Sequence, residues 1–181
     1  MYTLLTEGEK VELLGDLKVA GGSISFWLSH LQCAFLDGAW LEAYIWDEAR
    51  KVGIFSDCRW NLKVVDGKIF TEKDRDNRNE IDVALIYKAQ LLIVECKTGG
   101  REGLSAETLD WITGVATPLG GRFVSKILVS SLPMPNETDR SFELFKAKAE
   151  SRSVFLATRE DLPSIGKVLE EQAKNPKYPR I

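Results

Sequence analysis

The chain has 181 residues, of which 44% are hydrophobic, and this is enough for one well-buried core. Its 24 basic and 27 acidic side chains give a net charge of -3, so binding of nucleic acid would have to use a local basic patch. With no signal peptide and no apolar run near the ~20 residues of a membrane helix, we expect a soluble protein with no membrane partner. The three cysteines, Cys33, Cys58 and Cys96, lack a metal-binding spacing and leave one thiol over, which predicts a reduced, cytoplasmic protein.

The N-terminal segment, residues 1–37, has two interpretations. Residues 11–14 and 17–19 are candidates for short strands around a turn at residues 15–16. The segment is either an extension, such as an added hairpin, or the end of an upstream domain. The main domain is then expected to span residues 38–181.

A first helix is expected from residue 38 or 39 to Lys51, with Asp37 as its N-cap and Gly53 as its stop. Glu42 lies in the first turn, at the edge of the apolar stripe. An acidic residue at this position commonly does no more than complement the helix dipole, and spacing alone favours that interpretation.

A strand is expected over residues 59–65, followed by a tight turn and a polar run over residues 71–79. For any single basic residue of this run, a solvated loop is the simplest interpretation. Because the run comes directly before the next strand, its basic residues are also the best candidates for contacting phosphates: Lys73, Arg75 and Arg78.

A β-hairpin is predicted from two apolar runs, residues 79–87 and 91–97. If Ile86 faces Leu91, the register brings Asp82 opposite Glu95, where two like charges would repel each other. The two-residue period of a strand also places Lys97 on the same face as Glu95.

Two carboxylates on a rigid hairpin can bind a hard divalent cation, Mg²⁺ or Mn²⁺, and the backbone carbonyl of Cys96 could be a third ligand. An ammonium beside the ion, from Lys97, can orient an attacking water or hold charge on a phosphoryl oxygen. This combination points to phosphodiester hydrolysis. The simpler alternative is that Asp82 and Glu95 are solvated strand ends, with Lys97 as their surface ion-pair partner.

The rest of the chain predicts an α/β fold. Both faces of the hairpin are apolar, so a mixed central sheet covered by helices on both faces is expected. A glycine-rich connection over residues 98–103 carries Arg101, which could reach a substrate or simply lie on the surface. Further elements are then expected: a helix capped by Ser105, a strand over residues 123–130, a helix over 137–150, a strand over 154–157 and a helix over 162–173.

The order Asp82, then Glu95-x-Lys97, resembles the signature of the PD-(D/E)xK nucleases, with Ile81 in place of the first proline. Together with residues 38–42 and 79–83, it is similar to the nuclease domain of CRISPR-associated enzymes that cyclic oligoadenylates activate through a separate sensor domain. The resemblance runs from about Gly38 to near the C-terminus and implies a restriction-endonuclease-like core.

The resemblance implies a divalent-metal-dependent endonuclease that uses Mn²⁺ or Mg²⁺, with Glu42 assisting from its helix. Relatives of this kind suggest single-stranded DNA or RNA as substrate, a homodimer, and a role in antiviral defence. The usual sensor domain is not among these residues, so activation by a cyclic nucleotide does not follow from the resemblance. Two alternatives stay open: a structure-selective DNA endonuclease of repair or mobile elements, and a non-catalytic nucleic-acid-binding domain that keeps the nuclease fold.

Overall fold

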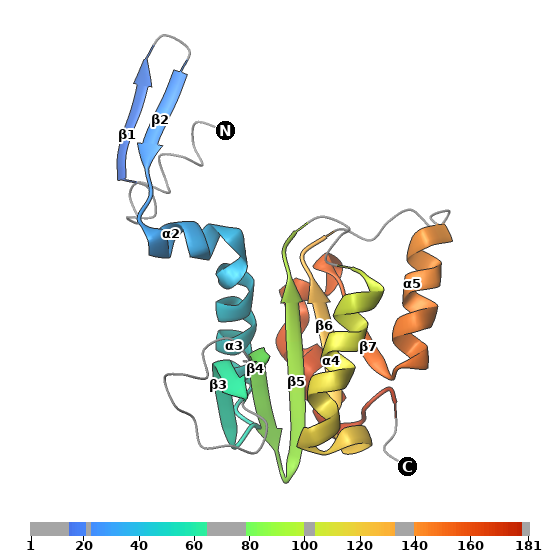
Figure 1. Cartoon of the computed structure of the whole chain (residues 1–181). Coiled ribbons are helices and arrows are strands. Elements are labelled where there is room, and N and C mark those ends of the chain that lie inside the picture. Colours follow the sequence, from blue (N-terminus) through green and yellow to red (C-terminus); the bar gives the residue numbers. More distant parts are fainter. Residues whose placement is uncertain (1–14, 21–22, 65–78, 100–103, 133–139, 179–181) are drawn as a thin grey trace. The chain divides into compact units, whose positions relative to one another are not determined.

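The computed structural model describes residues 15–20, 23–64, 79–99, 104–132 and 140–178 (Figure 1). The chain divides into two compact units, residues 1–40 and 41–181, and each is described here by itself. None of the described helices is long and apolar enough to cross a membrane.

The first unit contains an antiparallel pair of strands, β1 (Gly15–Ala20) and β2 (Ser23–Trp27), and the short helix α2 (His30–Ala34). The turn predicted at residues 15–16 is wrong, because both residues lie inside β1. The register pairs Ala20 with Ser23, so the two strands are connected between these residues. The strand predicted over residues 11–14 lies outside the described residues.

Helix α3 (Trp40–Val52) ends as predicted, at Gly53, which has a φ of +75° and donates its N–H to the carbonyl of Arg50. The N-cap role of Asp37 stays a prediction. Asp37 lies within a short helical turn, Phe35–Ala39, and the next residue, Gly38, has a non-helical φ of +151°, so the backbone is kinked directly before α3. Three side chains on one stripe of α3 are fully buried: Leu41, Ile45 and Ala49.

The second unit is built on a five-stranded mixed sheet in which the strands follow chain order. The strands are β3 (Asp57–Val64), β4 (Asn79–Tyr87), β5 (Gln90–Lys97), β6 (Ser125–Ser130) and β7 (Val154–Ala157). The first three are antiparallel, whereas β5, β6 and β7 are parallel to one another. The predicted mixed sheet is therefore confirmed.

Helices cover both faces of this sheet, as predicted. Helices α4 (Ala106–Leu119) and α5 (Arg140–Ser151) lie on the face toward the viewer in Figure 1. Their apolar side chains share one core cluster with residues of the strands, among them Ile93 and Leu128. Helix α6 (Ile165–Lys174), red in Figure 1, lies behind the sheet. The sheet residues of alternate parity, which point to that side, are also buried: Val83, Leu85, Leu92, Val94, Ile127 and Val129.

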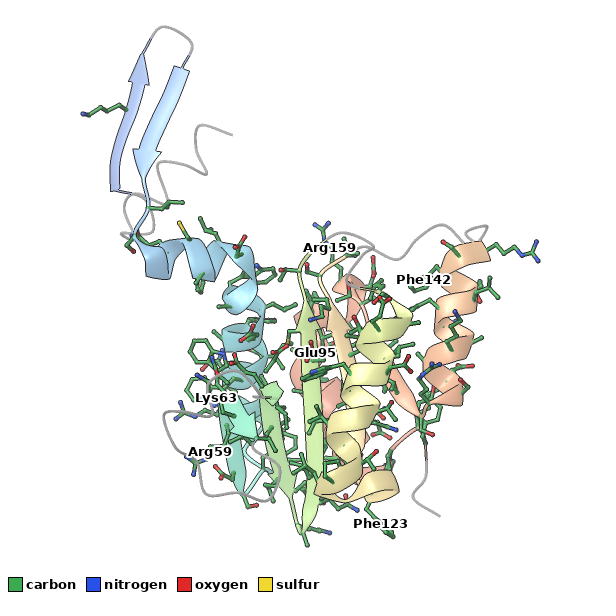
Figure 2. All side chains as sticks on the ribbon, in the orientation of Figure 1. Arg59, Lys63, Glu95, Phe123, Phe142 and Arg159 are labelled. Atoms are coloured by element: carbon green, nitrogen blue, oxygen red, sulfur yellow. The ribbon has the colours of Figure 1, made fainter. Side chains whose placement is uncertain are left out.

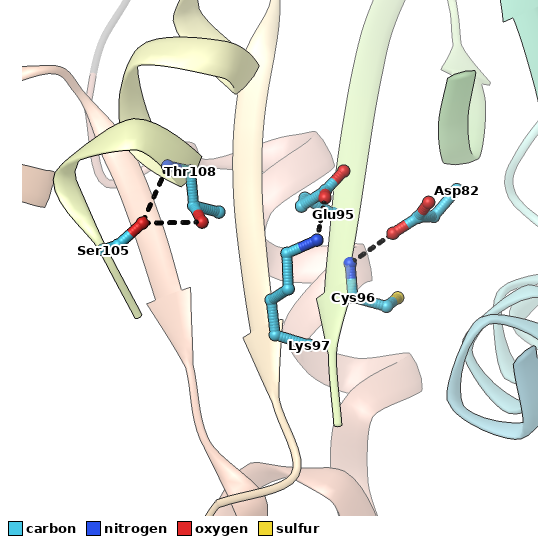
Figure 3. A network of polar contacts seen from close by, with 6 residues as sticks. All are labelled: Asp82, Glu95, Cys96, Lys97, Ser105 and Thr108. Carbon is cyan, nitrogen blue, oxygen red and sulfur yellow. Dashed lines mark hydrogen bonds and ion pairs between the residues drawn. The ribbon is translucent and has the colours of Figure 1, made fainter. Parts of the chain in front are cut away.

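Within the described residues, 3₁₀ turns precede two of these elements: η4 (Gly121–Phe123) comes before β6 and η5 (Arg159–Ser164) before α6. Helix α4 begins as predicted: the hydroxyl oxygen of Ser105 accepts the backbone N–H of Thr108 at 3.3 Å. Figure 3 shows this cap, with Ser105 and Thr108 at the start of α4.

The β4–β5 hairpin has the predicted register. Tyr87 pairs with Gln90 across a two-residue turn, and the pairs continue to Val83 with Val94. On the other side of β4 the ladder is interrupted, because Trp60 pairs with Val83 and Leu62 with Ile81, passing over Asn61 and Asp82. Asn61 has a φ of +53°, a backbone conformation that is uncommon for a residue other than glycine. The sheet is thus regular near the turn and irregular at Asp82.

Candidate active site

Asp82 lies where the β4–β5 pairs end. Its Oδ2 accepts the backbone N–H of Cys96 at 2.7 Å, so a carboxylate replaces the main-chain partner that a continued ladder would supply (Figure 3). This bond fixes the Asp82 side chain across the open end of the hairpin, next to Glu95. The pairing of Asp82 with Glu95 was predicted from the register, and the two carboxyl groups do interact electrostatically.

Glu95 is buried, with only 6% of its surface exposed. Its Oε1 accepts a hydrogen bond from Nζ of Lys97 at 2.5 Å, and the lysine is about one-third exposed (Figure 3). Its other oxygen, Oε2, is buried and has no hydrogen-bond partner in the described part of the chain. The alternative that Glu95 is a solvated strand end with a surface ion pair is therefore wrong: its carboxylate is held inside the protein.

Burial and nearby negative charge raise the pKa values of both carboxyl groups. Burial is the main cause that raises the pKa of Asp82 to about 8, followed by the charge of Glu95, and Glu42 adds to both. The hydrogen bond from the Cys96 N–H opposes the rise. Burial also raises the pKa of Glu95, while its bond to Lys97 opposes that shift.

The cationic partner responds in the opposite way. Burial alone would lower the pKa of Lys97, but its hydrogen bond to Glu95 and the charges of Glu95 and Asp82 outweigh burial, so its pKa is raised. Lys97 therefore remains an ammonium at neutral pH. The thiol of Cys96 is buried and its pKa is well above the ordinary value, chiefly because of burial, so it is an uncharged apolar side chain.

Glu42 joins the same group from α3. Its Oε2 accepts the indole N–H of Trp60 at 2.9 Å, and its charge acts on both Asp82 and Glu95. The structure thus brings together all four side chains that the sequence singled out for chemistry. They come from three elements: Glu42 from α3, Asp82 from β4, and Glu95 and Lys97 from β5.

Sequence reasoning missed Trp60. This side chain packs against Trp46, with ring centroids 6.1 Å apart, and the guanidinium of Arg50 lies 4.6 Å from the Trp46 ring. The indole N–H of Trp46 donates to the carbonyl of Cys58 at 3.1 Å, which ties α3 to β3. A large aromatic residue between charged and polar neighbours on β3 was the signal that could have drawn attention to it.

The donor set fits a hard divalent cation. Two carboxylates converge at the open end of the hairpin, and the buried Oε2 of Glu95 lacks the partner that such an oxygen requires. Among the described residues, no three side chains of histidine, cysteine, aspartate or glutamate form a ready cage. A cation here would accordingly need main-chain or solvent oxygens as well, as Mg²⁺ commonly does.

The four predicted phosphate-contacting residues, Lys73, Arg75, Arg78 and Arg101, lie outside the described residues. Among the described residues, β3 presents two exposed basic side chains, Arg59 and Lys63 (Figure 2). Arg59 is engaged with Asp57, its Nε lying 2.9 Å from the carboxylate.

Residues 30–175 match the model of the Card1-like endonuclease domain. The chain belongs to this family. The resemblance to nucleases that was predicted from Asp82, Glu95 and Lys97 is thereby confirmed at the level of the family. A search of curated proteins gave no match.

Two solved structures share the fold of this Card1-like domain. Protein VC1899 from Vibrio cholerae is 24% identical, with a TM-score of 0.71 over 98% of this chain and 44% of its own. Can2 from Sulfobacillus thermosulfidooxidans, solved with cyclic tetra-adenylate, is 17% identical, with a TM-score of 0.69 over 94% of this chain and 45% of its own. The chain thus spans less than half the length of either protein.

Proposed function

We propose that this chain is a divalent-metal-dependent endonuclease that hydrolyses phosphodiester bonds in nucleic acid. Membership of the Card1-like endonuclease family supports the reaction class. The observation that carries the metal dependence is the buried, partnerless Oε2 of Glu95 beside the buried carboxyl of Asp82. Two buried acids that repel each other are costly unless a cation joins them.

In this proposal Asp82 and Glu95 hold the ion, with the backbone carbonyl of Cys96 as a further ligand. A bound Mg²⁺ or Mn²⁺ would lower the pKa of a coordinated water and neutralise charge on the phosphoryl oxygens. Asp82, whose pKa is about 8 without a cation, would give up its proton when the site is filled.

The two remaining side chains act around that centre. Lys97 donates to Oε1 of Glu95, which aims its ammonium at the open end of the hairpin. There it can orient the attacking water and stabilise the charge that develops on phosphorus oxygens. Glu42, whose Oε2 accepts the Trp60 indole N–H, would accept a hydrogen bond from water at the same site.

We infer that the substrate is single-stranded DNA or RNA, bound with the help of Lys73, Arg75, Arg78 and Arg101. The resemblance to the CRISPR-associated nucleases supports a single-stranded substrate, and the positions of these basic residues, on both sides of the hairpin in sequence, support contacts to its phosphates. The free thiols Cys33, Cys58 and Cys96 agree with a cytoplasmic enzyme. Homodimer formation and a role in CRISPR-linked antiviral defence belong to the same proposal.

Regulation by a cyclic oligoadenylate is a separate part of the proposal. The similar protein Can2 was solved with cyclic tetra-adenylate, and this chain covers 45% of it. A sensor domain outside the present residues would then control the endonuclease domain. If the endonuclease domain is inactive by itself, addition of the sensor domain and its cyclic oligoadenylate should activate it.

The experiment is a cleavage assay with end-labelled single-stranded DNA, single-stranded RNA and duplex DNA, in Mn²⁺, Mg²⁺ or chelator. Wild type should cut a single strand only with a metal ion, and Glu95→Gln should lose the cleavage by at least about 10²–10³-fold. Glu143→Gln, an exposed acid on α5, is the matched control and should cut like wild type.

The substrate ranking decides between the alternatives. A strong preference for branched or duplex DNA would favour a structure-selective DNA endonuclease. Tight binding without turnover, in every metal and with a sensor domain and cyclic oligoadenylate present, would favour a non-catalytic binding domain and contradict the proposal.

A further inference from the structure

Trp60 is a large aromatic side chain left partly open to solvent beside the candidate active site. On β3 it is 42% exposed, although an indole is usually mostly buried in a folded domain. It pairs through the main chain with Val83, the residue that follows Asp82. Trp60 therefore lies on the strand next to Asp82, one of the two carboxylates proposed to hold the metal ion.

The Trp60 ring is held in place at two points. Its N–H donates to Glu42, and one side of the ring system packs on Trp46, tilted by 35°. Trp46 is itself fixed by its bond to the Cys58 carbonyl and by the Arg50 guanidinium. The side chain is thus oriented before any ligand arrives, and its exposed part keeps one orientation relative to Glu42.

We propose that the exposed part of Trp60 stacks on a nucleobase of the single-stranded substrate, next to the phosphodiester that is cut. This rests on the proposed nuclease function. Aromatic side chains that are exposed, rigid and close to a phosphate-handling centre are the platforms on which proteins hold single strands without reading their sequence. Every base has a flat face, so the stacking tolerates any base.

The proposal explains why a single strand would be favoured. In a duplex, each base is already stacked and paired, so laying one on Trp60 would require unpairing it first. A single strand pays no such cost. A nucleotide that lacks its base should lose the stacking contact with Trp60, whichever base has been removed.

A purely local role for Trp60 makes a different prediction. If the indole does no more than hold Glu42, the N–H matters and the ring does not contact the substrate. Trp60→Phe then removes the N–H that donates to Glu42 as completely as Trp60→Ala does. Both variants would lower kcat by the same factor and leave the affinity for the strand unchanged.

The test is fluorescence anisotropy with short 5′-fluorescein-labelled single strands of DNA and RNA in Mg²⁺. The protein is the full chain carrying Glu95→Gln, which we expect to bind strands without cutting them. We expect Trp60→Ala to weaken binding by about 5- to 100-fold and Trp60→Phe by less than about 3-fold. Phe123→Ala is the control, because Phe123 is also exposed, at 62%, but lies far from Glu95 (Figure 2). It should bind like its parent.

A second measurement uses strands in which each nucleotide in turn lacks its base. With Trp60 present, one or two such positions should weaken binding, and with Trp60→Ala the same positions should have no effect. A position at which removal of the base weakens binding only when Trp60 is present identifies the stacked base directly. Steady-state cleavage is then measured with chains that keep Glu95. Loss of the ring, in Trp60→Ala, should raise KM, whereas loss of the N–H, in Trp60→Phe as well, should lower kcat.

The outcomes separate this inference from the proposed function. If the otherwise unaltered chain cuts single strands but Trp60→Ala binds them as tightly as its parent, the stacking inference is wrong and the nuclease proposal stands. If wild type neither binds nor cuts any strand, even with a sensor domain and cyclic oligoadenylate present, both are wrong. Equal loss of affinity in Trp60→Phe and Trp60→Ala would also contradict stacking.

Discussion

The β4–β5 hairpin has a turn end, residues 84–93, and an open end, residues 79–83 and 94–97, which differ in what holds them together. At the turn end the main-chain pairs are regular, and Leu85 and Leu92 are fully buried. At the open end the β3–β4 pairs pass over Asp82, and a carboxylate instead accepts the Cys96 N–H. The same two strands thus provide a rigid scaffold at one end and a polar site at the other.

The difference between the two ends shows where this fold tolerates unfavourable interactions. Apolar burial stabilises the turn end by about 25 cal/mol per Å². The open end loses part of that gain, because Asp82 and Glu95 are desolvated close together and one oxygen of Glu95 lacks a partner. Such a site should form only when a well-packed sheet holds its backbone in place.

The largest expected change in stability is at the turn end. Leu85→Ala removes a fully buried side chain and should lower the free energy of unfolding by about 2–5 kcal/mol. Leu144→Ala, with the same chemical change at a position 56% exposed, should change it by less than about 0.5 kcal/mol. Urea unfolding followed by far-UV circular dichroism measures both, and similar losses in the two variants would refute the assigned packing.

At the open end, a substitution is expected to raise the free energy of unfolding rather than lower it. Asp82→Asn removes the repulsion with Glu95 and should raise the free energy of unfolding of the metal-free protein by about 2 kcal/mol near pH 8. The amide can still accept the Cys96 N–H through its oxygen. The same urea titration, in chelator, measures the gain, and a clear loss of stability would contradict the cost assigned to this site.

The contribution of Asp82 to stability depends on pH, and the direction of that dependence follows from its raised pKa. The ordinary pKa of Asp82 is 3.8, and in the folded protein it is about 8. Between these values the folded state holds a proton that the unfolded state has lost. The contribution of Asp82 to stability is therefore full below about pH 4 and decreases as the pH rises toward 8. The stability difference between wild type and Asp82→Asn should grow over this range, and a constant difference would show that the pKa is not raised.

The smallest expected effect lies in the helix that covers the hairpin. Ser105→Ala removes the N-cap of α4 and should lower the free energy of unfolding by about 1 kcal/mol, whereas Ser105→Thr should lose much less. Chemical denaturation compares the two variants. Equal losses would mean that the hydroxyl does not cap the helix.

Much of this comparison could be predicted from the sequence. Alternation of apolar residues fixed which of them share a face, and a short polar turn placed Ile86 opposite Leu91, as found. The two-residue period then placed Glu95 and Lys97 together, and they form an ion pair. These are local rules, and they succeed where backbone geometry alone decides the outcome.

The rest depends on contacts that local rules do not contain. The bond between Glu42 and Trp60 joins residues 18 positions apart, on a helix and a strand whose packing had to be known first. The Asp82 bond to Cys96 depends on where the ladder stops. The short helical turn over residues 35–39 and its kink at Gly38 were not expected either, because residue preference alone does not reveal them.

The central claim is that the open end of the hairpin binds a divalent cation, and Mn²⁺ binding tests it most directly. Isothermal titration of the full chain with Mn²⁺, with electron paramagnetic resonance to count bound ions, should show binding in wild type and loss of it in Asp82→Asn and Glu95→Gln. Glu143→Gln should bind like wild type. Undiminished Mn²⁺ binding in both site variants, or none in wild type, would contradict the account.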